Sequence, residues 1–247
     1  MHGRATILTL AIAAALAFAS PASAGPPYVT DDPQPTDYEH FEIYAFTGGT
    51  DGKDGVVSAT GIDFNYGGAP DLQLTAVLPL TLDNPRAGPD AIGIGNIELA
   101  AEYKFLHQED FGIDVAIFPR LFLPAVSANA GERHVSLLLP VFIGKTFDKL
   151  TTFGGAGCTI NQGDGSRNFC QMGWVVTYQV TPKLNLGFEI HHEGADTVGG
   201  AATTGLGIGA VYDINENFHL MASGGRGIQN AADTNRHSWY LALLSTF

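Results

Sequence analysis

Short stretches in which apolar and polar side chains alternate run through most of the chain after residue 40. In residues 71–81, Leu72, Leu74 and Leu78 fall on one parity, whereas Gln73 and Thr75 fall on the other. Such alternation is typical of β-strands that have one apolar and one polar face. Helical spacing of apolar residues is not sustained anywhere beyond residue 24. The pattern therefore predicts an all-β fold.

Twelve alternating segments, separated by turn-forming residues, are predicted as strands. They cover residues 40–49, 55–66, 71–81, 92–106, 111–125, 134–147, 150–160, 169–180, 183–193, 203–214, 218–228 and 236–247. Short connections, such as 148–149, alternate with longer ones, such as 82–91. Alternating short turns and long loops are typical of an antiparallel transmembrane up-and-down β-barrel, with the short turns on the periplasmic side. We predict one such barrel of about twelve strands over residues 40–247.

The two parities of the strands assign side chains to the two faces of this barrel. A basic side chain that faces lipid at the membrane midplane costs ~2–4 kcal/mol, so the polar parity should face the lumen. The predicted lumen lining comprises Glu42, Asp63, Asn65, Gln73, Glu98, Glu102, Lys104, Asp114, Arg120, Glu189, His191 and His219. At this barrel size the lumen either guides small solutes or is a closed core of ion pairs.

Both ends of the chain carry export signals. Arg4, an apolar run over 7–18 and the sequence Ala22-Ser23-Ala24 predict a cleaved signal peptide over residues 1–24. The apolar run is too short to cross ~30 Å of hydrocarbon as a helical anchor. At the other end, an alternating segment ends in Phe247 and resembles the C-terminal strand of bacterial outer-membrane barrels, which the barrel-assembly machinery reads. A strand of a secreted soluble sandwich is the alternative.

Residues 25–39 form an acidic segment with four prolines, at positions 26, 27, 33 and 35. Proline has no N–H to donate to a sheet, so this segment is not expected to be a barrel strand. Two interpretations stay open. The segment is a loose periplasmic tail, or it folds up into the lumen as a plug.

Composition narrows the classes of partner. The formal net charge of −13 argues against nucleic acid, which requires clusters of Lys and Arg. Excess acid in the lumen predicts a preference for cations or neutral solutes over anions. No nucleotide-binding motif or metal-binding spacing is present, so neither a cofactor nor a metal is expected.

Three short patterns suggest local chemistry. Cys158 and Cys170 flank a loop near the external end of a hairpin, and in an oxidising compartment they should form a disulfide rather than stay as free thiols. His134 and Ser136 share a strand face, as in outer-membrane phospholipases, but no motif supplies the orienting partner that a serine hydrolase needs. His191 and His192 are adjacent on a strand and point to opposite faces, which disfavours a shared metal.

Several motifs resemble one family along nearly the whole mature chain. They are Gly25–Pro33, Asn65–Leu74, Gly95–Leu99, Glu102–Phe105, Phe118–Arg120 and Thr151–Gly155. The chain is similar to the transporter-like outer-membrane proteins named after the meta-pathway of phenol degradation. The resemblance implies a barrel in the bacterial outer membrane with a transport role.

Together these observations predict a passive transporter or channel for small organic solutes, aromatic ones among them. The expected partners are outer-membrane lipid, the solute and, through Phe247, the assembly machinery. An outer-membrane lipid hydrolase and a closed structural barrel are the alternatives, and no enzymatic activity is expected from the preferred interpretation.

Overall fold

The computed structural model describes residues 26–127 and 131–247, so the predicted signal peptide lies outside the described residues. Its strands are β1 (Phe41–Asp51), β2 (Gly55–Ala69), β3 (Leu72–Pro85), β4 (Ala91–Ile94), β5 (Glu98–Leu106), β6 (Asp114–Ile117), β7 (Arg120–Phe122), β8 (Ser136–Phe147), β9 (Leu150–Asn161), β10 (Phe169–Thr181), β11 (Leu184–Glu193), β12 (Thr203–Asp213), β13 (Phe218–Gln229) and β14 (His237–Thr246). The described part has one short helix, α1 (Gln108–Phe111).

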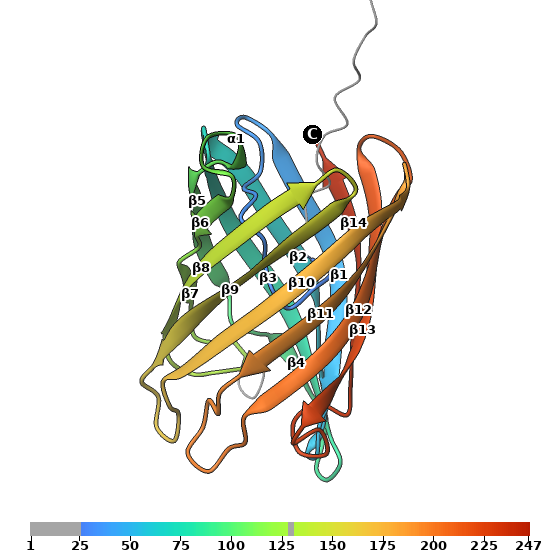
Figure 1. The fold of residues 1–247 in the computed structure, drawn as a ribbon. Coiled ribbons are helices and arrows are strands. Elements are labelled where there is room, and N and C mark those ends of the chain that lie inside the picture. The colour runs from blue at the N-terminus through green and yellow to red at the C-terminus, as the bar shows by residue number, and fades with distance from the viewer. Residues whose placement is uncertain (1–25, 128–130) are drawn as a thin grey trace, which may run out of the picture.

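The strands form one closed antiparallel barrel (Figure 1). Except at β4 to β7, each strand pairs with its sequence neighbours, and β1 pairs with β14 to close the ring. β4 and β5 both pair with β3, while β6 and β7 both bridge β5 and β8. Each of these pairs is one interrupted strand, so the ring has twelve strands. The predicted antiparallel barrel of about twelve strands is confirmed.

Two strands predicted as continuous are interrupted. Between β4 and β5 the side-chain amide of Asn96 donates to the Leu123 carbonyl at 2.7 Å, which turns this residue away from regular pairing. Between β6 and β7, Pro119 has no N–H to donate to a neighbouring strand. The predicted strand start at residue 111 was also wrong. Phe111 ends α1, Gly112 follows with a positive φ of 78°, and the strand begins at Asp114.

The outer surface of the barrel is apolar. On β3, Leu74 and Leu78 are 45% and 53% exposed, whereas Gln73 and Thr75 on the opposite parity are buried. Aromatic side chains such as Tyr103, Tyr178 and Trp239 also point outward and are exposed. A soluble protein buries its apolar side chains, whereas this barrel exposes them. Such an outer surface is expected of a barrel embedded in lipid, with aromatic girdles at its interfaces.

Among the described residues, no helix is long and apolar enough to cross a membrane.

Cys158 and Cys170 are register partners on β9 and β10, and a disulfide joins them in the structure. Both residues lie on the exposed outer parity, close to the loop that connects the two strands. The bond therefore fastens the long-loop end of this hairpin and lies outside the lumen.

Candidate functional site

The N-terminal segment, defined here as residues 26–39, lies inside the barrel rather than beside it (Figure 1). Its backbone is bound by a luminal side chain of β11. The N–H groups of Val29 and Thr30 donate to the two carboxylate oxygens of Glu189, at 3.1 and 2.7 Å. Glu189 is only 3% exposed, so these hydrogen bonds to a charged acceptor are shielded from water.

A buried ion cluster holds the same segment from the opposite wall. Arg120 binds the Glu98 carboxylate through Nε and Nη2, at 2.6 and 3.1 Å, and its Nη1 donates to Asp31 at 2.6 Å. This two-pronged arrangement uses the planar fork of the guanidinium group. Burial raises the pKa of the Asp31 carboxyl above its ordinary value, although the charge of Arg120 opposes the rise.

Two further hydrogen-bond networks bind the rest of the segment, one through neutral side chains and one through Asp114 and Lys104. The backbone N–H and the hydroxyl of Thr36 both donate to Oε1 of Gln73, at 2.8 and 2.7 Å, and the Gln73 amide donates to Asn65 at 3.0 Å. Gln34 donates to Asp114 at 3.0 Å and accepts a hydrogen bond from Lys104 at 2.9 Å. The segment is therefore bound by β3, β5, β6, β7 and β11 together.

Glycines on the luminal parity make room for this segment. A Cβ atom added to Gly173 would overlap the hydroxyl of Thr30, and one added to Gly187 would overlap the hydroxyl of Tyr28. At Gly144 the same atom would lie 2.9 Å from Pro33 Cγ. These three glycines form a bare wall on β8, β10 and β11, against which the segment packs, while the opposite wall is polar.

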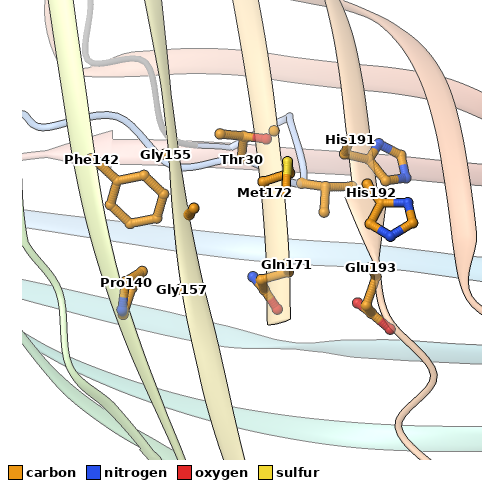
Figure 2. Close-up of a pocket in the computed structure, with 13 residues that line it drawn as sticks. Thr30, Pro140, Phe142, Gly155, Gly157, Gln171, Met172, His191, His192 and Glu193 are labelled. Atoms are coloured by element: carbon orange, nitrogen blue, oxygen red, sulfur yellow. The ribbon is translucent and has the colours of Figure 1, made fainter. Parts of the chain in front are cut away.

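The segment separates cavities at two levels of the lumen. A cavity of about 420 Å³ lies at the short-turn end of the barrel, where Tyr28 and Pro33 face Thr151 and Phe153 near the start of β9. Further along β9, towards the long loops, a pocket of about 20 Å³ remains beside Thr30. Figure 2 shows the ring of Phe142 and the imidazole of His191 on either side of Thr30. The larger cavity therefore lies between the segment and the short turns, whereas the space beside Thr30 is only large enough for water.

The structure brings five of the twelve predicted lumen-lining residues into direct contact with the segment. Gln73, Lys104, Asp114, Arg120 and Glu189 bind it directly. Four of the others make hydrogen bonds within the wall: Glu98 binds Arg120, Asn65 accepts from Gln73, Asp63 accepts from Asn65, and Glu42 accepts from Tyr44. Glu102 and His191 are buried, at 3% and 9% exposure. His219 pairs with Asp213 at 2.7 Å. His219 makes no hydrogen bond to residues 26–39 in the part of the chain that the structure describes.

The sequence analysis identified the segment and the polar side chains of the wall, but not the residues of the segment that contact them. Asp31, Gln34 and Thr36 carried no recognisable motif. One pattern in the sequence could have indicated the contact. Several strands carry glycines on the luminal parity, and glycine in a strand often marks a place where another backbone approaches closely.

The pattern considered for catalysis lies apart from this site, whereas His191 and His192, the pattern considered for metal binding, line the pocket beside Thr30. His134 Nε2 is hydrogen-bonded to the Asn161 side chain, and its Nδ1 lies 3.6 Å from Glu132. Within the described residues, no hydrogen bond joins His134 to Ser136. His192 binds the Thr204 hydroxyl at 2.8 Å, and the described part of the chain holds no group of three or more His, Cys, Asp or Glu residues that could hold a metal ion.

Solved structures with the same fold include an outer membrane channel from Pseudomonas putida F1. It is 16% identical, with a TM-score of 0.64, and the match covers 87% of this chain and 99% of that one. The KdgM porin, solved in complex with disordered oligogalacturonate, is 10% identical, with a TM-score of 0.59 and coverage of 83% and 99%. The translocator domain of the autotransporter NalP from Neisseria meningitidis is 12% identical, with a TM-score of 0.50 and coverage of 85% and 90%. These likenesses show the fold.

No curated protein matches the chain. A family model described as "Putative MetA-pathway of phenol degradation" matches residues 77–236, which is more than half of the chain and agrees with the resemblance seen in its motifs. The chain belongs to this phenol-degradation MetA-pathway family of proteins.

Proposed function

We propose that this protein is an outer-membrane channel for the passive movement of small organic solutes, and that the N-terminal segment closes its lumen at rest. The observation that carries the proposal is the position of the segment. It crosses the lumen between Glu189 on one wall and Arg120 and Gln73 on the other. Because side chains of the wall hold it there, release of these contacts would open the lumen without breaking the pairing of the barrel strands with one another.

The outer surface and the fold support the membrane location. Exposed apolar side chains cover the outside of the strands, and the solved relatives with this fold include a channel and a porin. We further propose that Phe247, whose backbone pairs with Phe41 and whose side chain is 58% exposed, is the residue that the barrel-assembly machinery contacts.

The lining of the lumen supports a class of solute. Tyr44, Phe118 and Phe142 point inward and are buried, and in an opened lumen their rings would face small aromatic or apolar solutes. Acidic side chains outnumber basic ones on the same face, which disfavours anions. The sequence carries no nucleotide-binding motif, and we propose that solutes move down their own gradient.

Planar-bilayer conductance tests this proposal. The refolded chain from Gly25, the predicted mature start, is compared with a chain that lacks residues 26–39. We expect small or rare steps from the former and larger steps from the latter, because the truncation removes the groups that bind Glu189, Arg120 and Gln73. Silence from both chains, with the barrels shown to be folded by their heat-dependent migration on gels, would contradict a channel and favour a closed structural barrel.

An outer-membrane lipid hydrolase is the second candidate, because His134 has an orienting partner in Asn161. Against it, His134 directs Nε2 to Asn161 and Nδ1 towards Glu132, so neither ring nitrogen is directed to Ser136. Hydrolysis of detergent-solubilised phospholipid that disappears in Ser136→Ala would support the hydrolase. Equal inactivity of both chains would remove it.

A further inference from the structure

The lipid-facing side of β12, β13 and β14 contains a groove that the proposed channel does not use. It has a volume of about 260 Å³ and is lined by Leu206, Ile208, Gly224, Arg226 and His237, among others. Gly224 is its floor. A Cβ atom added there would come no closer than 3.9 Å to another residue, the carbonyl oxygen of Ser238, so the space above Gly224 is open.

Arg226 is an unusual residue for this position. It pairs with Leu206 in the register of β12 and β13, shares the outward parity of Ala222 and Gly224, and is exposed. Throughout the described residues, its side chain has no ion-pair or hydrogen-bond partner. A basic residue on the lipid face costs ~2–4 kcal/mol at the midplane but only ~0–1 kcal/mol near an interface.

The neighbouring residues place Arg226 near the outer interface. Gly224 pairs with Trp239, which points outward and is 41% exposed, and tryptophan is enriched where lipid tails meet headgroups. Arg226 lies two residues beyond Gly224 towards the external end of β13. His237, the first residue of β14, lines the same end of the groove and is exposed. The groove therefore has a cationic end at headgroup level and an apolar floor directed towards the tails.

We propose that this groove binds a phosphate-bearing acylated lipid of the outer leaflet, of the lipid A type. The guanidinium group of Arg226 binds the phosphate through its planar fork, His237 adds a hydrogen-bond donor, and one acyl chain lies over Gly224 against Leu206 and Ile208. Charge complementarity supports this occupant, because the exposed guanidinium group of Arg226 lines the groove and has no acidic partner among the described residues. The inference rests on the outer-membrane location and on the orientation predicted from the loop lengths, which places the long loops outside.

Native mass spectrometry of the refolded chain from Gly25 in detergent tests the site with bisphosphorylated lipid A as the probe. We expect Arg226→Gln to weaken retention of this lipid about tenfold, which corresponds to ~1.4 kcal/mol. Gly224→Leu should weaken it by filling the groove while the charge remains. Arg167→Gln is the matched control, because Arg167 is an exposed arginine in the external loop after β9 whose side chain makes no ion pair within the described residues.

Two further probes identify the source of the phosphate. Dephosphorylated lipid A and inorganic phosphate alone should each be retained no better by the wild type than by Arg226→Gln. Equal retention of bisphosphorylated lipid A by wild type and Arg226→Gln would overturn the proposal. So would lipid-independent dimers that Gly224→Leu abolishes, since they would identify a second copy of the chain as the occupant.

The binding measurement is independent of conductance. The chain lacking residues 26–39 retains the whole groove and should bind lipid A as the longer chain does. If neither chain conducts while Arg226-dependent binding of lipid A is observed, the channel proposal is wrong and the lipid site is supported. If both chains conduct but neither retains lipid A in an Arg226-dependent way, only the lipid site is wrong.

Discussion

At the scale of single residues, one carboxylate fastens the N-terminal segment to the β11 wall. Glu189 accepts two backbone N–H groups, from Val29 and Thr30, in a buried environment. Hydrogen bonds to a charged acceptor contribute ~1.5–3 kcal/mol each, about twice the value for neutral pairs. The segment's residence in the lumen should therefore depend strongly on the charge of this one side chain.

Glu189→Gln should release the segment more often. Glutamine keeps one acceptor oxygen, so one hydrogen bond is lost and the other loses its charge. We expect the open fraction in planar bilayers to rise on the order of tenfold. Glu216→Gln, in the exposed turn before β13, is the matched control and should leave the open fraction unchanged. Indistinguishable traces from wild type and Glu189→Gln would show that this contact does not hold the segment.

A substitution at Gly173 tests whether the segment packs against the glycines of the wall. Gly173→Leu places a side chain where the hydroxyl of Thr30 now lies, so the segment should leave the wall while the barrel remains folded. Limited proteolysis should then remove the first residues from the variant faster than from the wild type. Gly224→Ala, which adds its methyl group in open space on the outer face, should behave like the wild type. Equal protection of the Gly173→Leu chain would refute close packing at this position.

At the scale of elements, the alternation of side chains was sufficient to predict the strands and their faces. Leu74 and Gln73 lie on the outer and inner faces as their parity requires, because every residue shift in a strand reverses the face. The interruptions near Asn96 and Pro119 were not predictable, since each depends on partners in other strands. The path of the segment was equally hidden, because Glu189 binds backbone N–H groups of Val29 and Thr30, which any residue except proline possesses.

The β9–β10 hairpin carries a prediction of its own. Cys158 and Cys170 should yield no reactive thiols when the unfolded, unreduced protein is titrated. A bond across this short loop is expected to contribute ~3 kcal/mol to the free energy of unfolding. The double variant Cys158→Ser/Cys170→Ser should therefore unfold at a lower temperature, with unchanged conductance because both residues face outward. Two reactive thiols per unreduced chain would exclude the bond.

At the scale of the whole molecule, the barrel is asymmetric around its lumen. Small glycine positions on β8, β10 and β11 face a polar wall on β1 to β7, and the segment fills the space between them. The segment also brings Asp31 to Arg120, so the only arginine of β7 is shared between one segment carboxylate and one wall carboxylate. Removing the segment leaves Arg120 paired with Glu98 alone, and it exposes the remaining acidic side chains of this wall to permeating ions.

The open channel should therefore select cations. With residues 26–39 removed, we expect Glu42, Asp63 and Glu102 to line a water-filled path that also contains Lys104, and rings of carboxylates favour cations in narrow pores. Reversal potentials in a salt gradient should report cation preference for the truncated chain, and Glu102→Gln in that chain should reduce it, whereas Glu216→Gln should not. An anion-selective reversal potential would mean that Arg120 and Lys104 dominate the field, and the path would then have to run along their side of the lumen rather than past the carboxylates.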